Sequence, residues 1–220
     1  MTAAAKAYRG IGMEGPVAAW YTKNTGRDLT RFEKVARLVA GRVRAGSDVL
    51  EVAPGPGYLT IELAKRGFQV TALDISRSFV RIARDNAAAA GVRADVQHGN
   101  AAAMPFADQA FDAVVCVAAF KNFSDPAGAI DEMYRVLRPG GTASIIDLRK
   151  DADAGEIAAE VSRMHLNAGN ALMTRWTFRH VLLKRAYTGE QLERMASRSR
   201  FERWDIAPDG IGFELRLVKA

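Results

Sequence analysis

A turn of alternating proline and glycine, Pro54-Gly55-Pro56-Gly57, follows a short apolar run at residues 49–53. A glycine-rich turn between a strand and a helix lets the backbone approach a nucleotide-like ligand closely. Dinucleotide-binding enzymes add a third glycine in the pattern G-x-G-x-x-G, but Thr60 stands at that position here. The turn therefore predicts a nucleoside-type ligand and disfavours an NAD-dependent oxidoreductase. A branched side chain at Gly57 is expected to block such a ligand sterically.

A lone carboxylate, Asp74, ends the next apolar run, Val70-Thr-Ala-Leu73. Its two oxygens can accept hydrogen bonds from both hydroxyls of a ribose, which is why nucleoside sites use an acidic residue at this point. The alternative is that Asp74 caps the helix expected from Arg77, a role that Ser76 would serve equally well. We predict the ribose role for Asp74.

Two further landmarks follow in order along the chain. Gly99-Asn100-Ala101 comes after a third apolar run, and an amide oxygen at Asn100 can accept from an exocyclic amine. Asn in a turn is also frequent for conformational reasons alone. Residues 135–143 contain Pro139-Gly140, which suits a type II turn and is structural.

The run from Glu51 through Ala53 and Gly55 to Gly57 resembles the E/D-x-G-x-G-x-G motif of class I S-adenosylmethionine-dependent methyltransferases. Ala53 replaces the first glycine, and we expect it to exclude a positive φ there. The resemblance covers residues 48–150 and implies S-adenosylmethionine as the cofactor. It places the cofactor on these residues: Tyr21, Glu51, Ala53, Pro54, Gly55, Gly57, Asp74, Ile75, Asn100, Ala101, Cys116 and Val117.

The acceptor site is expected after the fourth apolar run, in Cys116-Val-Ala-Ala-Phe120-Lys121-Asn-Phe123. This stretch has neither an Asn-Pro-Pro-Tyr tetrapeptide nor a Pro-Cys pair, which disfavours amide or base nitrogen acceptors and cytosine C5 chemistry. Lys121 either binds an anionic acceptor, acts as a base if burial lowers its pKa, or faces solvent. Cys116 is interpreted as a packed strand residue.

Aromatic residues flanking the core extend the predicted acceptor site. The substrate set is Trp20, Phe120, Lys121, Trp176 and His180, and Lys121 and His180 are the catalytic candidates. At helical spacing such aromatics equally suit a packed core. His98 is expected near the cofactor without an assigned task, and His165 is an alternative to His180. No metal ligand set is predicted from three scattered histidines and one cysteine.

The elements that must position these residues alternate between strand and helix. Strands are expected at residues 49–53, 68–73, 95–98, 111–118 and 142–148, with helices between them and from residue 17 to 44. Residues 154–200 contain no strand signal, and a hairpin around Ala-Pro-Asp-Gly closes the chain at 201–218. The fold class is α/β: a doubly wound, mostly parallel seven-stranded sheet with an antiparallel closing hairpin and helices on both faces.

This order divides one domain of residues 1–220 into four parts. Residues 1–46 are expected to be N-terminal helices that act as a lid, residues 47–150 the cofactor core, residues 151–200 a helical acceptor lid, and residues 201–220 the hairpin. The start of the chain lacks the apolar core of a signal peptide and no apolar run is long enough for a membrane span, so we expect a cytoplasmic protein. Oligomeric state stays open, with a homodimer allowed.

Charge separates along the chain, whose net charge is +6. Residues 1–47 hold nine Lys/Arg against three Asp/Glu, and residues 161–200 hold eight against two. A positive field favours an anionic partner, although solvated helix faces would give the same count. We predict methyl transfer to a small-molecule acceptor with an aromatic or anionic character. An RNA methyltransferase is the alternative, and a cofactor-binding domain without catalysis is a further one.

Overall fold

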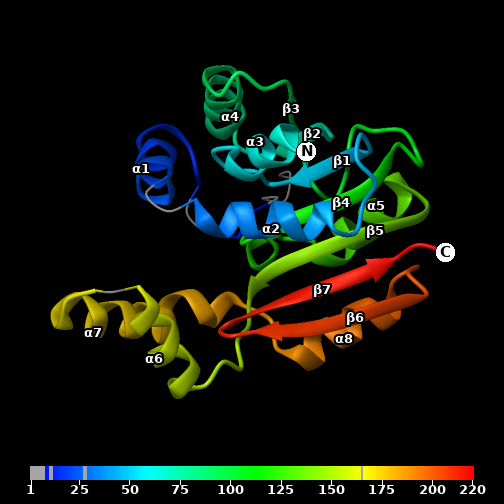
Figure 1. Cartoon of the computed structure of the whole chain (residues 1–220). Coiled ribbons are helices and arrows are strands. Elements are labelled where there is room, and N and C mark those ends of the chain that lie inside the picture. The colour runs from blue at the N-terminus through cyan, green and yellow to red at the C-terminus, as the bar shows by residue number, and fades with distance from the viewer. Residues whose placement is uncertain (1–7, 10–11, 27–28, 165) are drawn as a thin grey trace, which may run out of the picture.

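Seven strands form one sheet in the order β3-β2-β1-β4-β5-β7-β6 (Figure 1). The computed structural model describes residues 8–9, 12–26, 29–164 and 166–220. The strands are β1 (Asp48–Val52), β2 (Gln69–Asp74), β3 (Asp95–His98), β4 (Phe111–Val117), β5 (Leu137–Leu148), β6 (Arg203–Asp209) and β7 (Gly212–Val218). Neighbouring strands from β3 to β5 pair in parallel, and β7 is antiparallel to both of its neighbours. The predicted doubly wound order with a closing hairpin is confirmed.

Helices cover both faces of this sheet because its central strands are apolar on both sides. On one face, α2 (Thr30–Ala40) and α3 (Tyr58–Lys65) pack against Val49 and Val115, and α4 (Arg77–Ala89) packs against Ala72. On the other face, α5 (Pro126–Val136) and α8 (Gly189–Arg198) bury Leu50 and Cys116. The alternation of Val49 and Leu50 between the two cores follows from the two-residue period of a strand.

Residues 1–46, expected to form one N-terminal lid, contain two helices with different structural roles. Helix α1 (Gly15–Thr25) lies against α4, whereas α2 belongs to the core through the buried Phe32, Val35 and Val39. The predicted break between the two helices is found, since α1 ends at Thr25 and α2 begins at Thr30. Any covering role in this part of the chain therefore falls to α1 and the residues before it.

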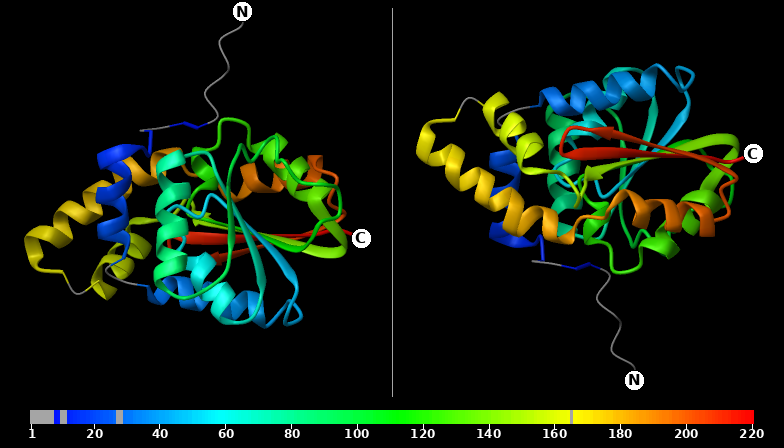
Figure 2. Two further views of the ribbon diagram at one scale, coloured as in Figure 1. Left: turned by 90° about the horizontal axis from the view of Figure 1, so that it is seen from above. Right: turned by 90° about the horizontal axis from the view of Figure 1, so that it is seen from below.

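The segment between β5 and β6 is helical, as the sequence predicts. It contains α6 (Ala154–Arg163), α7 (Ala168–Thr177), a π-helical turn η2 (Phe178–Leu182), a short 3-10 turn η3 (Leu183–Arg185) and then α8. Helix α6 is anchored by Ile157 and Val161, which pack with Leu183 and Ile211. Figure 2 shows α7 projecting beyond the carboxyl ends of the parallel strands, on the same side as α1.

Two boundaries differ from the sequence predictions. Strand β5 begins at Leu137, five residues before the expected Thr142, because Leu137 already pairs with Phe111 ahead of a register shift. Most of the Ala-Pro-Asp-Gly stretch belongs to strand β6, where Pro208 pairs with Phe213 of β7. The turn falls at Gly210, whose φ is 54°. Proline is tolerated there because β6 is an edge strand.

Candidate cofactor and acceptor site

The turn after β1 and the carboxylate after β2 meet because the two strands are parallel neighbours in register, with Val52 opposite Leu73. The Gly55 N–H donates to Asp74 Oδ2 at 3.0 Å, and the Ser76 N–H donates to Asp74 Oδ1 at 2.8 Å. Asp74 is only 5% exposed. Burial raises its pKa to about 6, opposed by the backbone N–H groups of Ser76 and Gly55. Each oxygen keeps acceptor capacity for a ligand donor.

Capping of α4 was the alternative role for Asp74, but Ser76 caps this helix. Ser76 is the N-cap of α4, and its hydroxyl accepts from the Phe79 N–H at 3.1 Å. Asp74 therefore has no capping task of its own. Its fixed position beside the glycine turn fits the predicted ribose contact, which stays a prediction.

The expectation that Ala53 excludes a positive φ is wrong. Ala53 has φ 57°, and its N–H donates to the Leu73 carbonyl at 2.8 Å. Ala118, directly after β4, repeats this arrangement with φ 57° and a 2.8 Å bond to the Ile146 carbonyl. A left-handed alanine costs about 1–2 kcal/mol, and backbone strain of this kind collects where a chain must turn sharply at a functional edge.

The two glycines of the turn have different surroundings. A Cβ on Gly55, at φ 56°, would meet only Tyr21 Cε1, at 4.0 Å. A Cβ on Gly57, at φ 80°, would lie 2.9 Å from Ala83 Cβ and 3.2 Å from its Cα. A side chain at Gly57 would therefore collide with α4, whereas the open space lies at Gly55. The expected steric block of a ligand at Gly57 stays a prediction.

Glu51 is buried within β1, directly behind the turn. The Thr60 hydroxyl donates a short hydrogen bond to Glu51 Oε2, so the residue that replaces the third glycine holds the acidic residue of the motif. Burial raises the pKa of Glu51 to about 7, and the Thr60 bond opposes this rise. A carboxyl group with this pKa changes charge near neutrality.

Apart from Tyr21, which lies in α1, the other predicted cofactor residues also lie at the carboxyl ends of the strands. Asn100 Oδ1 accepts from the Ala102 N–H at 3.0 Å, which closes a turn after β3 next to Ala101. Ile75 is partly exposed, and its carbonyl lies 3.1 Å from His98 Nε2. Val117 and Pro54 follow from β4 and β1 at the same edge. The geometry gathers these residues along one edge of the sheet.

Lys121 is neither solvent-facing nor free. Its ammonium donates to Asp147 Oδ1 at 2.6 Å and to the Ala118 carbonyl at 2.9 Å, while its backbone N–H donates to Asp147 Oδ2 at 2.9 Å. The Lys121 and Asp147 side chains are 10% and 1% exposed. Asp147, near the end of β5, was missed because its partner lies 26 residues away. A carboxylate inside an apolar strand is the signal that could have found it.

Cys116 is the second-last residue of β4 and lies near this pair. It is fully buried, and burial together with the Asp147 carboxylate raises the pKa of its thiol well above the ordinary value. A buried thiol with a raised pKa is a poor nucleophile. This agrees with its interpretation as a packed residue.

An N-terminal segment covers the edge where Asp74 lies. The Glu14 carboxylate accepts from the Arg77 and Ser78 N–H groups at 2.9 and 3.0 Å, at the start of α4. Tyr21 packs edge-on against Phe79, with ring centroids 5.7 Å apart, and borders Gly55.

Tyr8 was not singled out from the sequence, and the structure places it beside the predicted acceptor stretch. It forms a bridge with Phe123, and the Arg9 N–H donates to the Asn122 carbonyl at 2.7 Å. Burial raises the pKa of the Tyr8 phenol, and the carboxylates of Asp74 and Asp147 add to the rise. The pKa is also raised by the neighbouring Tyr21 phenol, so several groups of the site act on Tyr8.

The predicted aromatic acceptor residues do not form one wall. Trp20 and Trp176 are 67% and 59% exposed, and the Trp176 ring stacks at a tilt on His180, 5.5 Å away. Phe120 is fully buried, between Phe123 and Tyr187. His165 lies outside the described residues.

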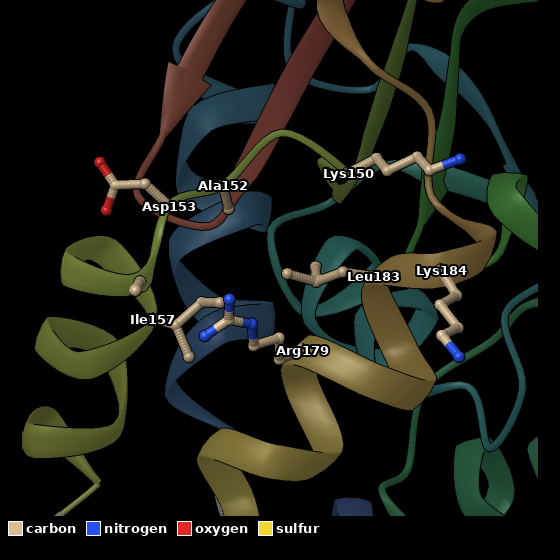
Figure 3. Close-up of a pocket in the computed structure, with 8 residues that line it drawn as sticks. Lys150, Ala152, Asp153, Ile157, Arg179, Leu183 and Lys184 are labelled. Carbon is tan, nitrogen blue, oxygen red and sulfur yellow. The ribbon is translucent and has the colours of Figure 1, made fainter.

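A hollow of about 320 Å³ opens between the end of β5 and the helical segment (Figure 3). Ile157 and Leu183 give it an apolar floor, and its charged lining consists of three cations, Lys150, Arg179 and Lys184, and one carboxylate, Asp153. Figure 3 shows the Arg179 guanidinium turned toward Ile157, whereas Lys150 and Lys184 extend to the other side. The cations frame the hollow without converging on one point.

The described part of the chain shows neither a metal-binding cluster nor a helix suited to span a membrane. No group of three or more His, Cys, Asp or Glu side chains there is arranged to hold a metal ion. None of the described helices combines the length and the apolar composition that crossing a bilayer would require.

The sequence is similar to known methyltransferases. Residues 50–145 match a family described as a methyltransferase domain. The chain is 36% identical over 127 residues to the ubiquinone/menaquinone biosynthesis C-methyltransferase of a Marinomonas species, covering 56% of this chain and 51% of that protein. The chain thus spans about half the length of the curated relative it matches.

Solved structures match over more of the chain. A Methanococcus maripaludis protein described as an S-adenosylmethionine-dependent methyltransferase superposes with a TM-score of 0.74, at 22% identity and 96% coverage of both chains. The [4+2]-cyclase SpnF has a TM-score of 0.63, at 22% identity, covering 85% of this chain and 80% of its own. A cyclase among the neighbours shows that this fold by itself does not fix one reaction.

Proposed function

We propose that this chain is an S-adenosylmethionine-dependent methyltransferase that methylates a small organic molecule. Residues 50–145 match the methyltransferase domain family, and the fold is that of a solved protein described as an S-adenosylmethionine-dependent methyltransferase. The observation that carries the proposal is the buried Asp74 carboxylate, fixed by the Gly55 N–H beside a turn whose surface at Gly55 is open.

The residues present fit this cofactor. Asp74 offers acceptor sites for the two ribose hydroxyls, Gly55 lets the backbone approach closely, and Tyr21 borders the same space. The Asn100 amide stands at the end of β3, where an adenine amine would be recognised. When bound, the sulfonium cofactor supplies an already activated methyl group, so positioning and exclusion of water account for much of the catalysis.

We assign Lys121 a positioning task rather than that of a general base. Its ammonium already binds the Asp147 carboxylate and the Ala118 carbonyl, so it ties the strained end of β4 to the end of β5. Neutral lysine would leave a buried carboxylate without its partner, which is costly. Tyr8 is the better candidate to touch the acceptor, because its bridge to Phe123 holds it against the predicted acceptor stretch and its burial raises the pKa of its phenol.

The acceptor we propose has an aromatic or apolar body and an anionic group. The Marinomonas relative is a C-methyltransferase of quinone biosynthesis, so a carbon atom of an electron-rich ring is the first acceptor atom to test. The hollow beside β5 supplies the matching surface, apolar at Ile157 and Leu183 and cationic at Arg179. It lies outside residues 50–145, so the support here is the local chemistry.

Calorimetry with S-adenosylmethionine, its demethylated product and NAD tests the cofactor assignment. We expect micromolar-range binding of the first two, about −8 kcal/mol, and weak binding of NAD. Asp74→Ala should weaken binding by about 1.5–3 kcal/mol, roughly tenfold to a hundredfold, and Asp74→Asn by less. A folded Asp74→Ala variant with unchanged affinity would remove the basis of the proposal.

Incubation with a metabolite library and search for mass gains of one methyl group tests the transfer. Short RNA is included as an acceptor, since the basic flanks also suit a polyanion. RNA methylation with a steep loss of RNA affinity at moderate salt would replace the small-molecule proposal.

A further inference from the structure

Helix α7 and the turn η2 carry large apolar side chains that the described part of the chain leaves exposed. Neither element has a buried residue, although both are rich in large apolar side chains. The exposed set, here called the α7 face, consists of Leu172 (71% exposed), Met173 (64%), Trp176 (59%) and Val181 (49%). Apolar residues gathered on one element mark an interaction surface more often than singly scattered ones do.

The α7 face is continuous on the helix and flanked by positive charge. Leu172 and Met173 lie four and three residues before Trp176, so the three share one side of α7. Arg175 and Arg179, four residues apart, run along its border, and neither has an ion-pair partner among the described residues. The whole stretch 161–189 contains five Lys/Arg and no Asp or Glu.

The α7 face stands beside the proposed acceptor site. Helix α7 projects past the carboxyl ends of the strands, and α1, with its exposed Trp20, lies on the same side (Figure 2). Arg179 belongs to both the α7 border and the hollow beside β5. A surface that covered the α7 face would therefore lie next to the entrance for an acceptor.

We propose that the α7 face docks on the surface of an anionic phospholipid bilayer. An interfacial helix combines an apolar stripe with flanking Lys or Arg and places tryptophan at the headgroup level, and Trp176 with Arg175 and Arg179 has this composition. The mode is peripheral and needs no membrane-spanning helix. It also brings the opening of the site to the phase where an acceptor with an apolar body would dissolve.

Charge argues against the other occupants. A second copy of the chain meeting itself through the α7 face would oppose two stretches with five cations each and no acidic residue in either. An acidic protein could satisfy the charges, but protein hot spots cluster in well-packed, desolvated pockets, whereas α7 and η2 contain no buried residue and the four apolar side chains of the α7 face are 49–71% exposed. The bilayer satisfies both the apolar and the cationic side chains.

Vesicle co-sedimentation of the full chain tests this proposal without any methyl transfer, so its outcome is independent of the proposed function. We expect binding to phosphatidylcholine vesicles that contain phosphatidylglycerol, weak binding to phosphatidylcholine alone, and release when salt is raised. Trp176 fluorescence should shift to the blue on binding, and the shift should be lost in Trp176→Phe.

Two pairs of variants separate the charge and the apolar contributions. Arg175→Gln with Arg179→Gln should weaken anionic-vesicle binding roughly fivefold per cation removed. The matched control is Arg44→Gln with Arg93→Gln, the same charge change at exposed positions before β1 and β3, at the opposite edge of the sheet. Leu172→Ser with Met173→Ser should reduce binding to both vesicle types, with thermal unfolding unchanged because neither side chain is buried.

Several results would overturn the proposal. These are no binding to anionic vesicles, equal losses in the Arg175/Arg179 and the Arg44/Arg93 variants, or binding untouched by Leu172→Ser with Met173→Ser. Concentration-dependent dimerisation that is lost in the Leu172/Met173 variant, without vesicle binding, would assign the face to a second copy. Loss of RNA rather than vesicle affinity in the arginine variant would assign it to a polyanion.

Discussion

The buried Glu51 carboxylate makes the protein less stable as pH rises toward neutrality, and Glu51→Gln should reverse this. Glu51 is fully buried in β1, and its pKa rises from 4.5 in the ordinary state to about 7 in the fold. Well below pH 4.5 both the folded and the unfolded chain hold the proton, so the difference in pKa does not change the free energy of unfolding. Between about pH 4.5 and 7 the unfolded chain releases the proton while the folded chain keeps it, so the free energy of unfolding falls as pH rises.

The magnitude follows from the size of the shift. The rise in pKa from 4.5 to about 7 corresponds to a loss of about 3 kcal/mol in the free energy of unfolding, which is complete above pH 7. Glutamine has nearly the same shape, carries no charge and can still accept from the Thr60 hydroxyl. We therefore expect Glu51→Gln to raise the free energy of unfolding by up to about 3 kcal/mol at pH 8, with the difference shrinking toward zero near pH 4.5.

Urea denaturation of the cofactor-free protein at several pH values measures the effect, provided that the m-value is unchanged. Glu62→Gln is the control with the opposite sign, because Glu62 pairs with Arg66 at 2.7 Å and Lys65 at 2.9 Å and these contacts lower its pKa. That variant should lose stability at pH 8. A Glu51→Gln protein that is less stable than the parent at every pH would show that the ionised carboxylate is stabilising, and the reasoning would fail.

The remaining predictions use the same site. Cofactor affinity, followed by calorimetry, should fall as pH drops below about 6, because Asp74 then gains the proton that competes with ligand donors; affinity independent of pH between 5 and 7 would contradict this. Gly57→Ala should cost about 2–5 kcal/mol of unfolding free energy through overpacking and strain, and Gly55→Ala about 1–2 kcal/mol while blocking the cofactor; equal losses would refute the distinction. Lys121→Met should cost about 3–5 kcal/mol by stranding a buried carboxylate, measured by denaturation. Cys116 should react with thiol reagents only as fast as the protein unfolds.

Much of the site could be predicted because local sequence determines where strands end. Asp74 and the Gly55 turn each follow an apolar run, and parallel pairing of such runs brings their carboxyl ends to one edge. That rule predicts that Glu51, Asp74 and Asn100 lie in one region of the sheet, although it predicts no distance between them.

The tertiary structure alone decided what depends on partners distant in the chain. Asp147 could not be matched to Lys121, 26 residues away, until β4 and β5 were paired, and the left-handed φ of Ala53 follows from a bond to a carbonyl of β2. The sequence predicts a ligand contact at Gly57, and only the position of α4 shows that a Cβ there would collide with Ala83. Sequence patterns report burial along one element, whereas close packing between elements selects the contacts that fill the space.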